Sequence, residues 1–260
     1  MPLMRLSHIT KRFGANVAVD DVSLDFAPGE IVGLVGENGA GKTTLMSIAA
    51  GELAADAGTI EDRAVTGVVH QHFLLVSEFT IAENLALAMW GRDAEETIRA
   101  SGIELRDVQR RIADLSVGEK AKLELIKAIA RHPRFLILDE PTSVLAPTEA
   151  RELFDVMRRL AAAGTTIVFI SHKIPEVLEV ATRIVVMRRG SIVADGGAMT
   201  AEQLAETMVE RRNLTLDARR SDSRRSDSLV RPALAQSSTT GALSMTNLPS
   251  TGRTGESDLR

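Results

Sequence analysis

The most informative stretch of the chain is Gly36-Glu37-Asn38-Gly39-Ala40-Gly41-Lys42-Thr43-Thr44. It matches the P-loop pattern G-x-x-x-x-G-K-[ST], whose glycines let successive backbone N–H groups point at phosphate oxygens. In this pattern Lys42 brings a mobile positive charge to the β- and γ-phosphates of a nucleotide, and the Thr43 hydroxyl ligates Mg²⁺. The stretch therefore predicts a nucleotide-phosphate site, and the alternative is an ordinary glycine-rich turn.

The residues on both sides of this stretch favour the P-loop interpretation. Pro28-Gly29 is typical of a turn, and residues 31–35 form a short apolar run, as in a buried strand. Residues 45–50 predict a helix that ends at Gly51. The positive N-terminal end of that helix would face the same phosphates. A strand, a loop and a helix in this order are the setting that a P-loop requires.

The rest of the chain predicts strands that alternate with helices. Apolar runs indicate strands at 67–70, 135–138 and 166–170, and periodicity indicates helices at 80–112, 115–131 and 148–163. Such alternation is typical of a parallel sheet covered on both faces. The alternating pattern of the first 26 residues and a hairpin at 184–194 indicate an antiparallel edge. We therefore expect an α/β fold of the P-loop NTPase class.

The composition narrows the class of protein. The chain has 260 residues and a net charge of −4, with 25% charged residues, so it is not a strongly basic nucleic-acid binder. It contains no cysteine, which excludes disulfides and thiolate metal sites and suits a reducing compartment. Its apolar stretches are shorter than the roughly 18 residues of a spanning helix. These features predict a cytoplasmic protein, unless a partner holds it at a membrane.

A second motif, Leu136-Ile137-Leu138-Asp139-Glu140, is an apolar strand that ends in two carboxylates. In a P-loop fold, an aspartate at the end of a neighbouring strand holds Mg²⁺, which is the role we predict for Asp139. The adjacent Glu140 can polarise a water molecule aimed at the γ-phosphate. The alternative is a strand that merely ends in a solvated acidic turn. The P-loop upstream favours the catalytic interpretation.

A third motif, Leu115-Ser116-Val117-Gly118-Glu119, opens the amphipathic helix. Ser116 and Glu119 have the spacing of a capping box, which is a purely structural interpretation. A helix N-terminus that carries a serine and a glycine is also suited to face a phosphate. Both interpretations can hold at once.

The order of these motifs resembles that of ABC-type ATPases. The P-loop is followed by Gln71, by residues 115–119, by Leu-Asp-Glu-Pro-Thr-Ser at 138–143 and by Ile-Ser-His at 170–172, and the resemblance covers roughly residues 3–210. Residues 70–73, 115–119 and 125–128 look most like the ATP subunits of nucleoside and simple-sugar importers. The resemblance implies a RecA-like core, an antiparallel β subdomain and a small helical subdomain near residues 74–130.

The resemblance also implies roles for single residues. Phe13 matches the aromatic residue that stacks on adenine, although it could instead be a core phenylalanine beside a turn. Gln71 matches the residue that contacts Mg²⁺ and the attacking water and links the site to a membrane partner. His172 matches the histidine that contacts the γ-phosphate and positions Glu140. The signature residues, which would close on ATP held by an opposite half, are Ser116, Val117, Gly118 and Glu119.

The function that the resemblance implies is binding and hydrolysis of ATP with Mg²⁺ to drive an importer. The implied partners are transmembrane permease subunits, an extracytoplasmic substrate-binding protein and a second ATPase half. The implied location is peripheral, on the cytoplasmic side of the cell membrane. Two alternatives remain: a soluble ABC ATPase of DNA repair or ribosomes, and a regulatory domain that binds nucleotide without turnover.

We expect the apolar stretch after Gln71 to form part of a groove that receives a permease helix, the alternative being core packing. Its apolar residues are Phe79, Ile81, Leu85, Met89 and Trp90. The chain also departs from the family pattern, and its segment from Gln71 to Ser116 is compact. A strand and loop are expected to be missing between Gly51 and Gln71, Lys-Ala-Lys at 120–122 replaces Gln-Gln-Arg, and residues 143–147 lack an aspartate that many ABC proteins carry.

The composition changes near Asn213, from where Ser, Thr and Gly dominate. Residues 213–241 are expected to be a linker, because they cannot bury enough apolar surface to offset their ordering entropy. Residues 242–248 repeat the apolar pattern of residues 3–9, so 242–260 are interpreted as the truncated start of a second ABC ATPase domain after a first domain at 1–212. The alternative is a complete protein whose tail is disordered and which forms homodimers.

Overall fold

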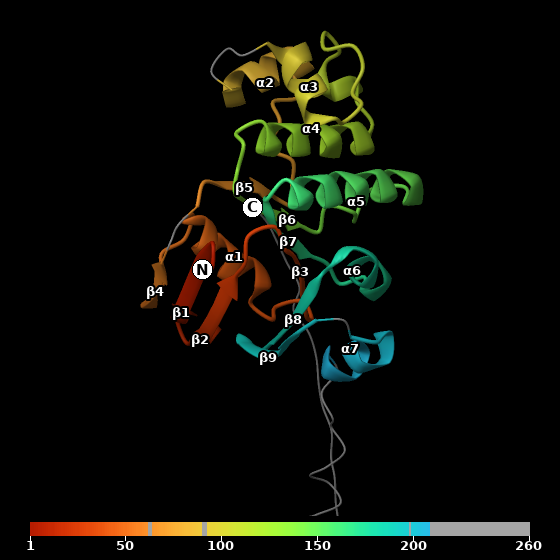
Figure 1. Ribbon diagram of the computed structural model, residues 1–260. Coiled ribbons are helices and arrows are strands. Elements are labelled where there is room, and N and C mark those ends of the chain that lie inside the picture. The colour runs from red at the N-terminus through yellow and green to blue at the C-terminus, as the bar shows by residue number, and fades with distance from the viewer. Residues whose placement is uncertain (62–63, 90–92, 198, 209–260) are drawn as a thin grey trace, which may run out of the picture. The chain divides into compact units, whose positions relative to one another are not determined.

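The computed structural model describes residues 1–61, 64–89, 93–197 and 199–208. Its largest element is a six-stranded sheet in the spatial order β5-β6-β7-β3-β8-β9 (Figure 1). The first five strands in that order are parallel, and β9 pairs antiparallel with β8. The bounds are β3 Ile31–Val35, β5 Thr66–Val69, β6 Phe135–Asp139, β7 Thr166–Ile170, β8 Arg183–Arg188 and β9 Ser191–Gly196. The predicted parallel sheet and the late hairpin are confirmed.

The central strands are apolar throughout because both faces of the sheet are covered. Successive side chains of β6 point to opposite faces, so Phe135 and Ile137 belong to one apolar cluster and Leu136 and Leu138 to the other. One cluster packs under α1 (Lys42–Ala50), and the other under α5 (Pro147–Ala162) and its neighbours. The carboxyl ends of the parallel strands therefore meet at one edge of a rigid layer, where P-loop folds place their ligands.

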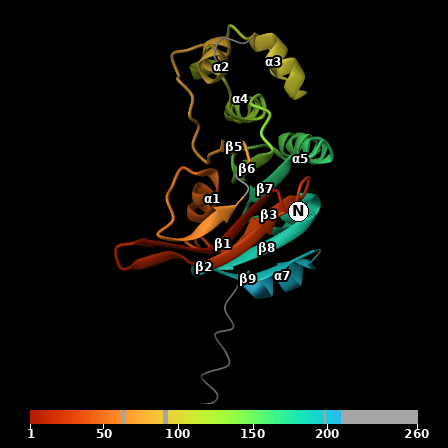
Figure 2. The same ribbon diagram turned by 60° about the vertical axis from the view of Figure 1, so that its left-hand side comes forward.

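A separate three-stranded antiparallel sheet has the order β2-β1-β4. Its strands are β1 Met4–Phe13, β2 Asn16–Phe26 and β4 Ala57–Glu61. Helix α1 lies between this sheet and the large one (Figure 2). The Phe26 ring packs edge-to-face on the Phe135 ring, with 4.9 Å between the ring centroids. This sheet confirms the antiparallel β subdomain that the resemblance implies. Because β1 pairs on both sides within it, the N-terminal strands do not form the antiparallel edge of the large sheet. The stretch between Gly51 and Gln71 also keeps a strand, β4.

Helices α2 (Ile81–Met89), α3 (Ala94–Ser101) and α4 (Val117–Ile129) group together beside α5, as the helical subdomain expected near residues 74–130 (Figure 1). The prediction of one helix over residues 80–112 is wrong. Asp93 caps the start of α3 by accepting from the Glu96 N–H, and Gly102 ends it with a φ of 66°. After Gly102 the chain is irregular up to a short 3-10 turn, Ile112–Asp114, which precedes α4. Helices α6 (Ile174–Val180) and α7 (Ala201–Met208) were not expected.

The apolar stretch after Gln71 is largely core. Ile81, Leu85 and Met89 are at most 6% exposed, so the expectation that they line a permease groove is wrong for these three residues. Trp90 lies outside the described residues, as do the proposed linker and second domain start at 213–260. Within the described part of the chain, no helix is both long enough and apolar enough to cross a membrane.

Candidate nucleotide site

The P-loop runs from the end of β3 into the start of α1. Gly41 is the N-cap of α1 with a φ of 98°, and a β-carbon there would lie 2.2 Å from the Ala18 carbonyl oxygen, so only glycine fits. Gly41 also has no side chain to bond the first N–H groups of α1. These N–H groups and the positive end of the helix remain available to an anion.

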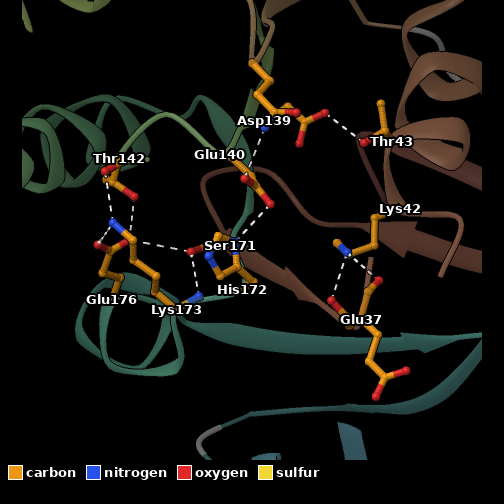
Figure 3. Close-up of polar contacts among 12 residues, drawn as sticks. Glu37, Lys42, Thr43, Asp139, Glu140, Thr142, Ser171, His172, Lys173 and Glu176 are labelled. Atoms are coloured by element: carbon orange, nitrogen blue, oxygen red, sulfur yellow. Dashed lines mark hydrogen bonds and ion pairs between the residues drawn. The ribbon is translucent and has the colours of Figure 1, made fainter. Parts of the chain in front are cut away.

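Lys42 is turned toward the loop that precedes it. Its Nζ donates to the carbonyl oxygens of Gly36, at 2.8 Å, and Glu37, at 3.0 Å (Figure 3). Burial lowers the pKa of the Lys42 ammonium, and the charges of Glu140 and Asp139 partly oppose this effect. A phosphate oxygen can replace either carbonyl as the acceptor, and its negative charge would favour the protonated lysine.

Thr43 and Asp139 come together at the carboxyl end of β6. The Thr43 Oγ1 donates a 2.8 Å hydrogen bond to Oδ2 of Asp139, which is 8% exposed. Burial raises the pKa of Asp139, although the hydrogen bond from Thr43 opposes the shift. A bound cation would reverse this effect, because it favours the ionised carboxylate.

Glu140 contacts both of the other residues to which the resemblance assigns catalytic roles. Its Oε1 lies 3.0 Å from Nδ1 of His172, and its Oε2 lies 3.4 Å from Nε2 of Gln71. The Glu140 backbone has a φ of 50°, in the left-handed region that non-glycine residues seldom adopt. Its N–H still bonds the Ile170 carbonyl of the adjacent strand at 3.0 Å. Such strain is typical of residues that are held in place for function.

These residues line one cavity of about 410 Å³. Phe13, which is 52% exposed at the end of β1, forms one wall, so it is not a core phenylalanine. Asn16 and Ala18 line the same cavity, which could not be predicted because they belong to the antiparallel sheet. The other lining residues are Asn38, Gly39, Ala40, Gly41, Lys42, Thr43, Thr44, Gln71, Asp139, Glu140 and His172.

The signature residues 116–119 are not among those that line the cavity. Ser116 and Glu119 form the predicted capping box: the Glu119 N–H donates to the Ser116 hydroxyl, and Oε2 of Glu119 accepts from the Ser116 N–H at 2.8 Å. Arg110 also binds the Glu119 carboxylate. A β-carbon on Gly118 would lie 2.2 Å from Oε1 of Glu149, so this glycine allows α4 to pack against the start of α5. Val117 is 48% exposed at the surface.

One tertiary contact near Gln71 was not predicted at all. The backbone of Leu74, three residues beyond Gln71, is bound at both of its polar groups by α4. Its N–H donates to Oε1 of Glu124 at 2.7 Å, and its carbonyl accepts from Nζ of Lys127 at 2.8 Å. We call Glu124 and Lys127 the Leu74 clamp. The available signal was the glutamate itself, which stands within an otherwise apolar run of the amphipathic helix.

A family model matches the part of the chain that carries these motifs. The profile of the family described as ABC transporter matches residues 19–143, which include the P-loop, Gln71, the signature residues and both carboxylates. Residues 19–143 match the ABC transporter domain. We refer to the part of the chain that carries the family motifs, roughly residues 3–210, as the ABC domain.

Several relatives of the ABC domain have names that concern import. The nucleoside import ATP-binding protein of Lactococcus lactis subsp. cremoris is 36% identical over 80% of this chain and 47% of its own length. A ribose import ATP-binding protein of Burkholderia ambifaria is 41% identical over 81% of this chain and 47% of its own length. The glucose import ATP-binding protein of Haloferax volcanii is 36% identical over 84% of this chain and 50% of its own length. The chain thus spans about half the length of these relatives.

Solved structures agree with the fold of the ABC domain. A nucleotide-free ATP-binding cassette of an ABC transporter superposes with a TM-score of 0.69 at 23% identity, covering 81% of this chain and all of its own. A dimeric cassette bound to ADP and Pi gives a TM-score of 0.68 at 22% identity. The match covers 76% of this chain and 99% of that cassette. At this identity the likeness concerns the fold alone.

The residues of the ABC domain fit MgATP. The uncapped start of α1 and Lys42 suit the phosphates, and the exposed Phe13 ring suits a base at the far wall of the cavity. The Thr43 hydroxyl and the Asp139 carboxylate are hard oxygen ligands that already lie together, which suits Mg²⁺. When bound, Mg²⁺ neutralises charge on the phosphates.

Proposed function

We propose that this ABC domain binds and hydrolyses ATP, with Mg²⁺, as the motor of an importer for nucleosides or simple sugars. The observation that carries the proposal is the convergence of the P-loop, Asp139, Glu140 and His172 on one cavity, although they come from separate strands and loops. The names of the relatives support the substrate class. The permease and an extracytoplasmic substrate-binding protein would be separate parts of that importer, and the domain would lie at the cytoplasmic side of the membrane.

In the proposed reaction, phosphoryl transfer needs positioning and charge stabilisation more than covalent help from the protein. Glu140 would accept the proton of the attacking water, and Gln71 and His172 would hold that carboxylate from both of its oxygens. Lys42 and the N–H groups of α1 would stabilise the charge that develops on the phosphates. The general base is the most specific of these roles, so it gives the sharpest test.

Two substitutions test the proposal. Glu140→Gln should retain ATP affinity while turnover falls by roughly 10²- to 10⁴-fold, because the base is lost and the phosphate cradle remains. Lys42→Ala should instead lose tight binding, since it removes the buried cation of the loop. The measurements are ATP titration and phosphate release for both variants and for wild type. Wild-type turnover in Glu140→Gln would rule out Glu140 as the base.

The signature residues belong to the same proposal. Because they do not line the cavity of their own chain, we infer that they face ATP held by a second ATPase half. One candidate for this half is a second domain in the same polypeptide, because residues 242–248 repeat the apolar pattern of residues 3–9. Turnover of the isolated chain should then be slow when it is dilute. Strong specific activity that rises with concentration, with residues 213–260 deleted, would favour a homodimer over a tandem protein.

We also propose where the permease binds. Leu74 and Leu87 are 65% and 63% exposed, and Val76 and Phe79 are partly exposed, so apolar side chains gather after Gln71 even though the interior of α2 is buried. Leu87→Asp should abolish association with the permease subunits in detergent and leave the melting temperature unchanged. Val193→Asp, on β9, is the matched control at a partly exposed position. Equal association of both variants would exclude α2 as the contact.

A further inference from the structure

The two loops that carry Glu140 and His172 leave the sheet side by side. They follow β6 and β7, which pair in parallel with Asp139 opposite Ile170. Beyond this point the sheet fixes only one more contact, the 3.0 Å hydrogen bond from the Glu140 N–H to the Ile170 carbonyl. The 3.0 Å contact between Oε1 of Glu140 and Nδ1 of His172 therefore depends on how the two loops are held.

One carboxylate joins the two loops. Glu176, on α6, accepts a short hydrogen bond at Oε2 from the Thr142 hydroxyl and one at Oε1 from Nζ of Lys173 at 3.0 Å (Figure 3). The Ser171 hydroxyl lies farther away, 3.5 Å from Oε2. Thr142 lies two residues after Glu140, whereas Ser171 and Lys173 stand on either side of His172. Glu176 therefore contacts the chain next to both members of the Glu140–His172 pair.

The hydroxyl partners of Glu176 are sheltered from water, whereas the Lys173 side chain is 38% exposed. Thr142 and Ser171 are each 2% exposed, and the Glu176 side chain is 17% exposed. Lys173 also donates from Nζ to the Thr142 carbonyl at 3.0 Å, which ties the two loops a second time. Buried hydrogen bonds to a charged group are strong, and a buried partner left without its bond is costly. The position of Glu176 in the first turn of α6 adds the favourable end of the helix dipole.

Glu176 does not itself line the nucleotide cavity, whereas Glu140 and His172 do. Any effect of Glu176 on the reaction must therefore pass through the two loops. We propose that Glu176 is a positioning residue that fixes His172 against Glu140, which rests on the proposed function of this site. Its role is to hold two groups from different strands at the separation that the general base requires.

The test compares Glu176→Ala and Glu176→Gln with Glu179→Gln, a matched change on the same helix. The Glu179 side chain is 48% exposed, and its carboxylate forms a long ion pair with the Arg158 guanidinium, at 3.8 Å. For Glu176→Ala we expect kcat to fall roughly 10- to 100-fold with ATP affinity within about twofold, because a misplacement near 1 Å has an effect of this size. Glu176→Gln should show a smaller loss, and Glu179→Gln none. A loss of ATP affinity equal to the loss of kcat would overturn the proposal.

A double-mutant cycle separates positioning from general destabilisation. In a His172→Ala background, adding Glu176→Ala should lower kcat by less than about threefold, because both changes remove the same contact. Fully additive losses would overturn the proposal. Should Glu176→Ala not fold, as its melting temperature would show, Glu176→Gln is carried through the same cycle with the same two outcomes.

A spectroscopic measurement makes the inference independent of ATP turnover. The protein has five histidines, so the ring ¹H–¹³C signals of His172 can be assigned by the loss of one set in His172→Ala. We expect these signals to shift in both Glu176 variants and to stay unchanged in Glu179→Gln. Unchanged signals in the Glu176 variants would overturn the positioning role even if the protein hydrolyses ATP. A wild-type protein that lacks ATPase activity would instead overturn the proposed function, and the signals would still report on Glu176.

Discussion

Thr43 donates a 2.8 Å hydrogen bond from Oγ1 to Oδ2 of Asp139, across 96 positions of sequence. The first residue stands at the start of α1 and the second at the end of β6. A hydroxyl and a carboxylate are both oxygen ligands that suit Mg²⁺. Because the folded chain already brings these two oxygens together, it supplies part of the metal geometry before any ligand binds.

Asp139→Asn should remove most of the dependence of ATP binding on Mg²⁺. In the wild type, ATP should bind more tightly with Mg²⁺ than with a chelator. In the variant we expect the increase in ATP affinity on adding Mg²⁺ to be at least about tenfold smaller, which is roughly 1.4 kcal/mol. The reason is that the amide of asparagine carries no negative charge for the cation. Titration with a fluorescent ATP analogue, with and without Mg²⁺, measures the gain. Asp155→Asn, at a 72% exposed side chain on α5, is the control, and an equal gain in both variants would contradict the prediction.

Phe13→Ala should weaken ATP binding without weakening the binding of phosphate groups. Stacking of a base on an aromatic ring contributes about 1–3 kcal/mol, so we expect a loss of roughly 5- to 150-fold for ATP. Tripolyphosphate has no base and should bind wild type and variant equally. Phe13→Trp should rescue ATP binding, and Phe79→Ala, outside the cavity, should leave it unchanged. An equal loss for tripolyphosphate would show that Phe13 shapes the loop rather than holding the base.

The capping box of α4 should make stability depend on pH. The hydrogen bond from Arg110, followed by that from the Ser116 N–H, holds the pKa of Glu119 below its usual value of 4.5. A carboxylate with a depressed pKa in the folded protein stabilises it above the unfolded pKa, and this contribution is lost as the pH falls through the folded pKa. Glu119→Gln should therefore lower the melting temperature near neutral pH and flatten its decline below about pH 4.5.

The measurement for Glu119 is thermal unfolding between about pH 3 and 7. Glu104→Gln is the control, because the Glu104 side chain is 87% exposed and its nearest cation, on Arg106, is 3.8 Å away. The control should follow the wild-type curve at every pH. A Glu119→Gln curve that runs parallel to the wild type would mean that its carboxylate is not stabilised in the folded state.

The Leu74 clamp should be important for stability. Lys127→Ala leaves the Glu124 carboxylate, only 7% exposed, without its cation, and breaking a buried pair in this way costs about 3 kcal/mol. The double variant Glu124→Gln, Lys127→Met should recover much of this loss, since it removes both charges and keeps an acceptor for the Leu74 N–H. Urea unfolding gives the free energies. Lys122→Ala is the control, because the side chain of its partner Glu152 is 62% exposed. If Lys127→Ala lowers the free energy of unfolding by no more than Lys122→Ala does, the Glu124–Lys127 pair does not behave as a buried pair.

Sequence alone located most of the sheet and the phosphate-binding part of the site. Residues 31–35, 135–138 and 166–170 are continuous apolar runs, and the structure makes each of them a buried strand. The helix predicted over residues 80–112 was wrong because single residues interrupt it. Asp93 starts a new helix within this pattern, and Gly102 ends that helix. Helices α6 and α7 were not predicted because each is only two turns long, too short for a clear period.

The P-loop could be recognised from sequence because its conformation is local. Glycines, a lysine and a threonine lie next to one another, and their chemistry follows from backbone freedom and the start of one helix. The contacts of Thr43 with Asp139, of Leu74 with the clamp and of Glu176 with Thr142 join residues 34 to 96 positions apart. The other partners of Glu176, Ser171 and Lys173, lie within five positions of it. Only tertiary structure decided the long-range contacts, because they require separate strands to end at one edge of a sheet and a helix to pack across a distant loop.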